Sequence, residues 1–160
     1  MKIKTLLLTG ENNHDWERSA PCCKKLMEQT GKFEVDLTEE PSQALANRDE
    51  LNEYDLFFVD YNGTMWSELA KVNFVDAIRN GVGVCILHAA NNAFPGWVDY
   101  EKICALLWRE GTSHGSYHKF DIKITDPEHP ITKGLPEIIK DHPDELYHKL
   151  VHMHDSLSLI

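Results

Sequence analysis

Apolar runs that end abruptly in polar residues, with helical patterns between them, constrain the fold of this chain most strongly. Residues 3–9 (IKTLLLT) form a continuous apolar run that stops at Gly10, as expected of a fully buried parallel strand. Residues 17–30 then carry apolar side chains at helical spacing, and Gly31 follows as a helix stop. This succession of strand, loop and helix is the building unit of an α/β fold.

The same unit recurs along the chain. The further predicted elements are a strand at 33–37, a short helix or irregular connection at 41–51, a strand at 54–59, a helix at 67–79, a strand from residue 81 that stops at His88, a helix at 99–108 and a strand at 119–125. The alternation predicts an α/β fold with a mostly parallel sheet. With 160 residues, 42% of them hydrophobic, we expect one domain over residues 1–160.

Charge and hydropathy exclude several classes of partner. The formal net charge of -10 at pH 7 argues against nucleic acid, which needs clustered Lys and Arg. The longest apolar stretches are much shorter than the roughly 18 residues that span a bilayer. The apolar start meets Gly10 without a cleavage pattern, so it predicts a strand and not a signal peptide, and a cytoplasmic protein. The four cysteines form neither a disulfide framework nor a CxxC pair.

Polar residues follow the strands at the points where a ligand site is expected. In doubly wound sheets ligands bind beyond the carboxyl ends of the strands, and a flavodoxin-like order 2-1-3-4-5 places strands one, three and four side by side. The residues at these three ends are Asn12, Asn13, His14, Asp15 and Trp16, then Asp60, Tyr61 and Asn62, then His88, Asn91 and Asn92. We expect them to converge on one rim of the sheet.

His88 stands at the tip of the fourth strand. Histidine titrates near neutrality, so this residue could be a general base, a metal ligand or a structural hydrogen-bonding residue. Asn91 and Asn92 could bind sugar hydroxyls or cap the next helix. Both alternatives stay open from the sequence.

The loop after the first strand carries three further candidates. Asp15 could orient the imidazole of His14, or it could cap the helix that follows, which is the simpler interpretation. Trp16 could offer a stacking face to a sugar or pack in the interior.

Residues 108–118 (WREGTSHGSYH) place His114 and His118 four positions apart. The glycines and serines favour a loop over a helix. The two histidines, near His88 and His14, could form a metal site of mixed imidazole and oxygen ligands for Zn, Mn or Mg. Cysteine ligands and an HExxH spacing are both missing from this stretch.

Two other sets of residues complete the candidates. Glu145 and Tyr147 in DELYHKL could bring a carboxylate and a phenol to the rim, or cap a short helix. Cys85 comes three residues before His88, inside the strand, so we expect its thiol to be buried and inert. GxSxG, P-loop and GxGxxG motifs do not occur.

Six segments in register carry a family resemblance: LLLTGENNHDW, VDYNG, VCILHAANNAFPGW, WREGTSHGSYHKF, ITDPEHPITKGLP and DELYH. Together they resemble the ThuA-like family, named for trehalose utilisation, over almost the whole chain. The resemblance implies a flavodoxin-like three-layer sandwich of the class I glutamine amidotransferase-like type. In it His88 occupies the nucleophile-elbow position that holds cysteine in true amidotransferases, so glutamine hydrolysis is not expected.

The resemblance also implies a pocket and a biological context. The pocket would hold His14, Asn62, His88, Asn91, His114, His118, Glu145 and Tyr147. Members are associated with bacterial sugar catabolism, including disaccharides oxidised to keto sugars. The family usually continues beyond DELYH into further strands, whereas this chain ends at SLSLI, so we expect a truncated product or a domain that completes its sheet with a partner.

We therefore expect a sugar-processing enzyme, a hydrolase or isomerase acting on glycosides or keto-glycosides. His88, with His14 or His118, would move protons, and Asn62 and Asn91 would hold the sugar. A divalent metal and a homo-oligomer are compatible with this prediction. The alternatives are a non-catalytic carbohydrate-binding or assembly module on the same fold, and a hydrolase that uses Cys85.

Overall fold

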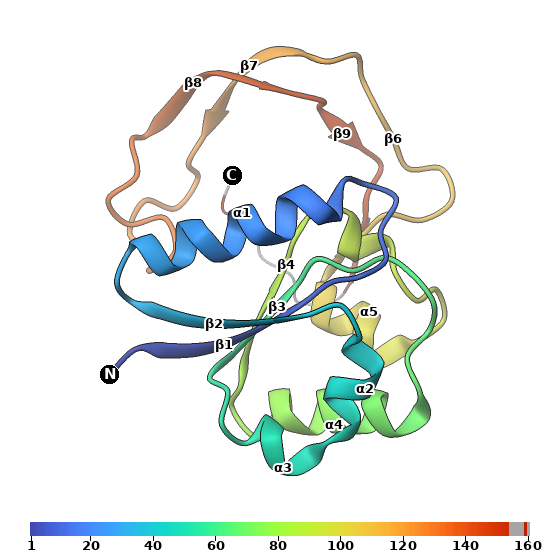
Figure 1. Cartoon of the computed structure of the whole chain (residues 1–160). Helices are drawn as coiled ribbons and strands as arrows, with labels where there is room; N and C mark the ends of the chain where they lie inside the picture. The colour runs from blue at the N-terminus through green and yellow to red at the C-terminus, as the bar shows by residue number, and fades with distance from the viewer. Residues whose placement is uncertain (154–158, 160) are drawn as a thin grey trace. The chain divides into compact units, whose positions relative to one another are not determined.

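The first apolar run is an inner strand of a parallel sheet. In the computed structural model, which describes residues 1–153 and 159, β1 (Ile3–Leu8) pairs with β2 (Phe33–Thr38) and with β3 (Leu56–Val59). β4 (Gly83–Ile86) joins β3, so the order is β2-β1-β3-β4, all parallel (Figure 1). The sheet confirms the predicted α/β class and places the ends of β1, β3 and β4 side by side.

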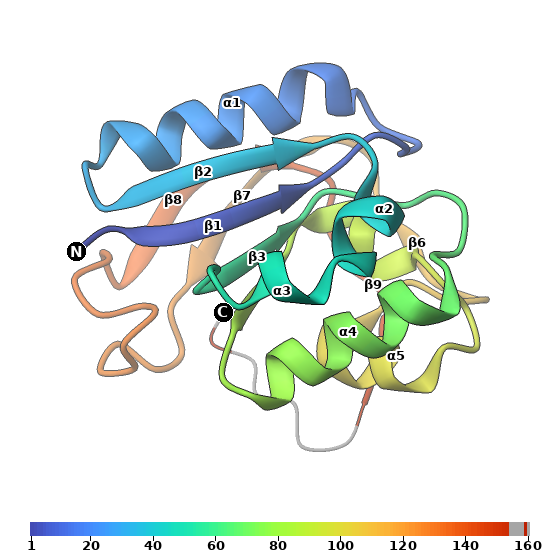
Figure 2. The same ribbon diagram turned by 60° about the horizontal axis from the view of Figure 1, so that its bottom comes forward.

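Helices cover both faces of this sheet. α1 (Trp16–Gln29) buries Ala20 on one face, against Leu7 and Val35 (Figure 2). The other face is covered by α2 (Pro41–Ala46), α3 (Arg48–Leu51), α4 (Glu68–Arg79) and α5 (Val98–Cys104). The β1–α1 connection turns at Gly10, where φ is +115° and a Cβ atom would lie 2.0 Å from the carbonyl oxygen of Glu39. This glycine is therefore required by close packing as well as by its φ angle.

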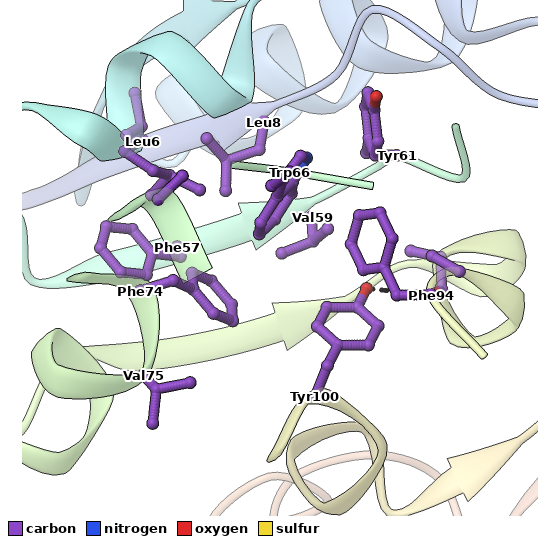
Figure 3. Packing of buried hydrophobic residues seen from close by; sticks show 14 of the residues in the cluster. Leu6, Leu8, Phe57, Val59, Tyr61, Trp66, Phe74, Val75, Phe94 and Tyr100 are labelled. Atoms are coloured by element: carbon purple, nitrogen blue, oxygen red, sulfur yellow. Dashed lines mark hydrogen bonds between the residues drawn. The ribbon is translucent and has the colours of Figure 1, made fainter. Parts of the chain in front are cut away.

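An aromatic core lies under the end of β4. Trp66 is 2% exposed and packs edge-on against Phe94, with ring centroids 4.9 Å apart (Figure 3). The hydroxyl of Tyr100 donates a 2.9 Å hydrogen bond to the carbonyl of Ala90. Ala90 belongs to the 3₁₀ turn η1 (His88–Asn92). The aromatic core thus fixes η1, the turn that begins at His88 and leads toward α5.

The chain divides into two compact units, Met1–Cys104 and Ala105–Ile160. The second unit contains three antiparallel strand pairs among its described residues: β5 (Leu106–Leu107) with β10 (Val151–His152), β6 (Ser113–His114) with β9 (Tyr147–His148), and β7 (His118–Lys123) with β8 (Ile138–Asp144). One domain over residues 1–160 stays a prediction.

Two predicted elements differ from the structure. The helix predicted at 99–108 ends at Cys104, because Ala105 adopts a positive φ of 64° and the chain then enters β5. The strand predicted at 119–125 exists as β7, but it pairs antiparallel with β8 instead of continuing the parallel sheet. A strand at the SLSLI end would cover residues 156–160, of which 156–158 and 160 lie outside the described residues, so that expectation is not tested. Within the described residues, no helix has both the length and the apolarity that a membrane span requires.

The prediction that Cys85 is buried is wrong. Its side chain is exposed because β4 is the edge strand of the parallel sheet. Desolvation by its neighbours still raises the pKa of the Cys85 thiol, which disfavours the thiolate that a cysteine nucleophile needs.

Candidate functional site

The ends of β1, β3 and β4 bring three predicted residues together within the first unit. The Nε2 atoms of His14 and His88 lie 3.0 Å apart. Asn62, at the end of β3, donates from its side-chain amide to the side-chain oxygen of Asn13 at 2.9 Å. The two histidines are 74 residues apart in sequence, and the two asparagines are 49 residues apart. Loops that are distant in sequence therefore meet at one edge of the sheet, as the order of the strands predicts.

Asn13 determines the protonation pattern of the histidine pair. Its side-chain oxygen accepts from Asn62 and from the Nδ1–H of His14, 3.1 Å away. An amide oxygen can only accept, so the neutral His14 ring carries its proton on Nδ1 and has an unprotonated Nε2. The contact with His88 is then satisfied by the Nε2–H of His88 pointing to Nε2 of His14. The pair presents one unprotonated and one protonated Nε2 atom.

His88 occupies a strained backbone position. Its φ is 37°, although it is neither glycine nor asparagine. The chain reverses there from β4 into η1, and the small residues Ala89 and Ala90 are buried directly behind it. Such strain persists only where the surroundings fix it, and it concentrates at functional sites. A sharp turn after a strand is also the geometry of a nucleophile elbow.

A buried carboxylate holds the loop that carries His14. Asp60, at the end of β3, is 3% exposed and accepts hydrogen bonds from Ser19 Oγ at 2.6 Å and from the Asn12 amide at 3.0 Å. The side-chain oxygen of Asn12 in turn accepts from the backbone N–H of His14 at 3.1 Å. Asp60 thereby positions the backbone of His14, while Asn13 positions its ring.

A second carboxylate joins the same two loops. Glu11 accepts from the backbone N–H of Thr64 at 2.6 Å and from the hydroxyl of Tyr61 at 2.8 Å. The Thr64 N–H, with the Tyr61 and Thr64 hydroxyls, lowers the pKa of Glu11. Burial and the bond to Glu11 raise the pKa of Tyr61. A Cβ atom on Gly63 would lie 2.2 Å from Glu11, so this approach requires glycine.

The remaining candidates of the first unit have simpler surroundings. Asp15 occupies the N-cap position of α1, but its side chain makes no capping hydrogen bond. Its Oδ2 atom lies 3.5 Å from Nη1 of Arg18. Trp16 is the half-buried first residue of α1. Asn91 and Asn92 lie in η1 and are half-buried. Neither can cap α5, which begins only at Val98, so that alternative is wrong.

The second unit holds the other predicted site residues. Nδ1 of His114 lies 3.3 Å from Glu145 Oε2 and 2.9 Å from the carbonyl of Gly115, to which it donates. The ring of Tyr147 lies 5.5 Å from that of His114, and burial raises its pKa. His118 donates from Nδ1 to the carbonyl of Ser116 at 2.7 Å. Glu145 and Tyr147 are on or beside β9, so the predicted short helix at this point is wrong.

Comparisons with known proteins identify the family. A family model described as trehalose utilisation, ThuA, matches residues 4–160. The chain belongs to the ThuA family. A search of curated proteins finds no significant match.

Two solved ThuA-like structures are similar to this chain. The protein from Parabacteroides merdae is 34% identical with a TM-score of 0.82, covering 94% of this chain and 64% of that one. The protein from Bacteroides uniformis is 21% identical with a TM-score of 0.69, covering 91% and 60%, and this likeness concerns the fold alone. The chain thus spans less than two thirds of either ThuA-like protein.

A cavity elsewhere in this ThuA chain is a weaker candidate. It encloses about 370 Å³ at the amino ends of β3 and β4, with Arg48, Tyr54, Asn73 and Asp76 in its lining. None of the predicted site residues lines it. Its main polar groups are already paired within the protein, because Arg48 lies 3.6 Å from Asp76 and the Asn73 amide donates to two carbonyls of α2. We place the candidate site at the opposite strand ends, where the imidazoles meet.

The sequence placed Asn13 and Asp60 at the same rim as His14 in this ThuA chain but did not predict that they hold it, and Glu11 was not among the candidates. The roles of Glu11 and Asp60 depend on side-chain contacts between loops about 50 residues apart. One sequence feature could have pointed to Asp60: an ionisable residue that directly follows an apolar strand is buried only when it is hydrogen-bonded.

Proposed function

We propose that this chain carries the catalytic histidines of a ThuA-family enzyme of carbohydrate catabolism. The substrate class is a glycoside or keto-glycoside, and the reaction is a proton-transfer step of hydrolysis or isomerisation. The observation that supports the proposal is the contact between the Nε2 atoms of His14 and His88 at the strand ends.

The pair has the chemistry that such a step requires. The unprotonated Nε2 of His14 is suited to accept a proton from a sugar hydroxyl. The Nε2–H of His88 is suited to donate to a neighbouring carbonyl or leaving-group oxygen. In this proposal Asn62, at the end of β3, and Asn91, in η1 after β4, hydrogen-bond the hydroxyls that orient the sugar.

Turnover on a panel of glycosides and keto-glycosides tests the proposal. We expect His88→Ala and His14→Ala each to reduce turnover by about 100-fold or more, as loss of a general acid or base does. His142→Ala, an imidazole of the second unit, is the matched control and should leave the rate unchanged. Unchanged rates in His88→Ala would refute the proposal.

Calorimetry and mass spectrometry on the same panel separate catalysis from binding. Sugar binding without any product would favour a non-catalytic carbohydrate-binding module on this fold. Rapid labelling of Cys85 with no loss of turnover would exclude the hydrolase that uses a thiol.

A further inference from the structure

The contact between His14 and His88 is bent and not straight. The Nε2 atoms are 3.0 Å apart, and the ring centroids are 4.6 Å apart with the planes at 89°. A straight N–H···N bond between two imidazoles would separate the centroids by about 5.3 Å. At least one ring axis therefore deviates from the line that joins the two Nε2 atoms.

This geometry matches two ligands of one metal ion. With a metal–nitrogen distance of about 2.0–2.1 Å, a ligand angle of 90° gives about 2.9 Å between the nitrogens and about 4.5 Å between the ring centroids. The observed separations are 3.0 Å and 4.6 Å. We propose that His14 and His88 bind a divalent first-row transition metal ion through their Nε2 atoms.

The groups behind the rings support this assignment. A metal-binding histidine typically donates its other ring N–H to an oxygen, which fixes the tautomer and leaves the ligating nitrogen unprotonated. His14 does this through its Nδ1–H to Asn13, whose oxygen is fixed in turn by Asn62. Asp60 and Asn12 hold the backbone of the same residue. His14 is therefore prepared as a ligand in the absence of metal.

The ligand chemistry limits the choice of ion. Imidazole nitrogens suit Ni²⁺, Cu²⁺ and Zn²⁺, and an angle near 90° is that of neighbouring positions in tetragonal or octahedral coordination. Mg²⁺ prefers oxygen ligands. Among residues 1–153 and 159, no three His, Cys, Asp or Glu side chains are grouped to hold a metal, so within this range the two imidazoles are the protein ligands proposed. The inference shares its residues with the proposed function but does not require turnover, and a metal bound by both Nε2 atoms would occupy the nitrogens that the proposed proton transfer uses.

Titration of the tag-free full chain with Ni²⁺, followed by calorimetry, tests the inference directly. We expect one equivalent per chain, with affinity reduced at least tenfold in His14→Ala and in His88→Ala. Asn13→Ala keeps both ligands but removes the acceptor for Nδ1, and should weaken binding by about 10-fold to 100-fold. His142→Ala should bind as the wild type does, and Mg²⁺ should not compete.

Wild-type protein provides a test that does not depend on any variant. Paramagnetic Ni²⁺ at this position should broaden the ring proton resonances of His14 and His88 first. No binding by the wild type, or full binding in His14→Ala or His88→Ala, would overturn the proposal. Loss of binding in His114→Ala but not in His14→Ala would also overturn it, because the metal would then belong to the second unit.

The two proposals fail separately. Metal bound at the pair without sugar turnover would support the inference and contradict the proposed function. Turnover by a chain that binds no metal would do the reverse.

Discussion

The two units of this chain differ in how they hold their polar residues. In Met1–Cys104 a four-stranded parallel sheet is covered on both faces, and a large aromatic cluster fills one side. In Ala105–Ile160 the described strands form two-stranded antiparallel pairs, and the buried hydrophobic residues among those described are Leu107 and Ile124. Isolated strand pairs are only marginally stable. The candidate histidines of the second unit, His114 and His118, are exposed, and they belong to strands with only a small apolar core among the described residues.

The difference determines how precisely each unit can present a side chain. His14 and His88 are fixed from behind by Asp60, Asn13 and the core residue Tyr100, which anchors η1. His114 has a backbone carbonyl and a half-exposed carboxylate as partners, on a strand of two residues. Geometry tight enough for proton transfer or metal binding is better supported in the first unit.

The largest expected effect comes from the aromatic core. Trp66→Ala should lower the free energy of unfolding by about 3–5 kcal/mol, because it leaves a cavity among Phe74, Phe94 and Tyr100. Denaturant unfolding measures this loss. Ile131→Ala, at a side chain 75% exposed in the second unit, is the control and should change stability by less than about 0.5 kcal/mol. Equal losses at both positions would remove the contrast between the units.

Next in size is the buried carboxylate. Asp60→Ala should cost about 2 kcal/mol, because Ser19 and Asn12 lose a charged acceptor. The ring resonances of His14 should broaden or shift, since its loop is released. Asp144→Ala in the second unit, an exposed carboxylate, should cost less than about 1 kcal/mol. An unchanged His14 spectrum in Asp60→Ala would show that this carboxylate does not position the histidine.

Backbone strain gives a smaller effect. His88→Gly should be more stable than His88→Ala by about 1 kcal/mol, because glycine adopts a φ of 37° without steric cost. Lys149, with a φ of 59° in the second unit, is the matched position. We expect a smaller difference between glycine and alanine there, since its surroundings can relax. Thermal unfolding of the glycine and alanine variants at both positions measures the two stability differences. If His88→Ala were more stable than His88→Gly, the backbone strain at His88 would be contradicted.

The smallest effect is a pH dependence at Glu11. Its pKa is lowered in the folded protein, so its stabilising contribution is complete above the ordinary value of 4.5 and is lost as the pH falls through the lower folded-state pKa. Glu11→Gln removes this titration. The stability difference between wild type and variant should therefore shrink as the medium becomes more acidic. A difference independent of pH would show that the carboxylate is not held by Thr64 and Tyr61.

The fold was more predictable than the arrangement of its site. The apolar runs at 3–9 and 54–59 and the run from Gly81 each became a parallel strand, because buried strands need continuous apolar sequence. The strand order then placed His14, Asn62 and His88 at one edge. The strands follow from the periodicity of apolar residues, and the position of the three side chains follows from the strand order, so both can be predicted from a single sequence.

Other features depend on contacts that local sequence does not encode. Cys85 lies in an apolar run, yet it is exposed because β4 is the edge strand of the parallel sheet. The positive φ of His88 arises from the packing of η1 on the core. The antiparallel partner of β7 lies 15 residues beyond its end, past two turns, and alternation alone does not select it.

The shared oxygen of Asn13 has one further consequence. Because Asn62 and His14 both donate to it, a sugar hydroxyl that draws the Asn62 amide away would leave the imidazole as its sole occupant. That bond would then shorten, and Nε2 would become more electron-rich. Under the proposed function, occupancy of the Asn62 amide would thus be communicated to His14, and the ¹⁵N shift of the His14 ring would report it.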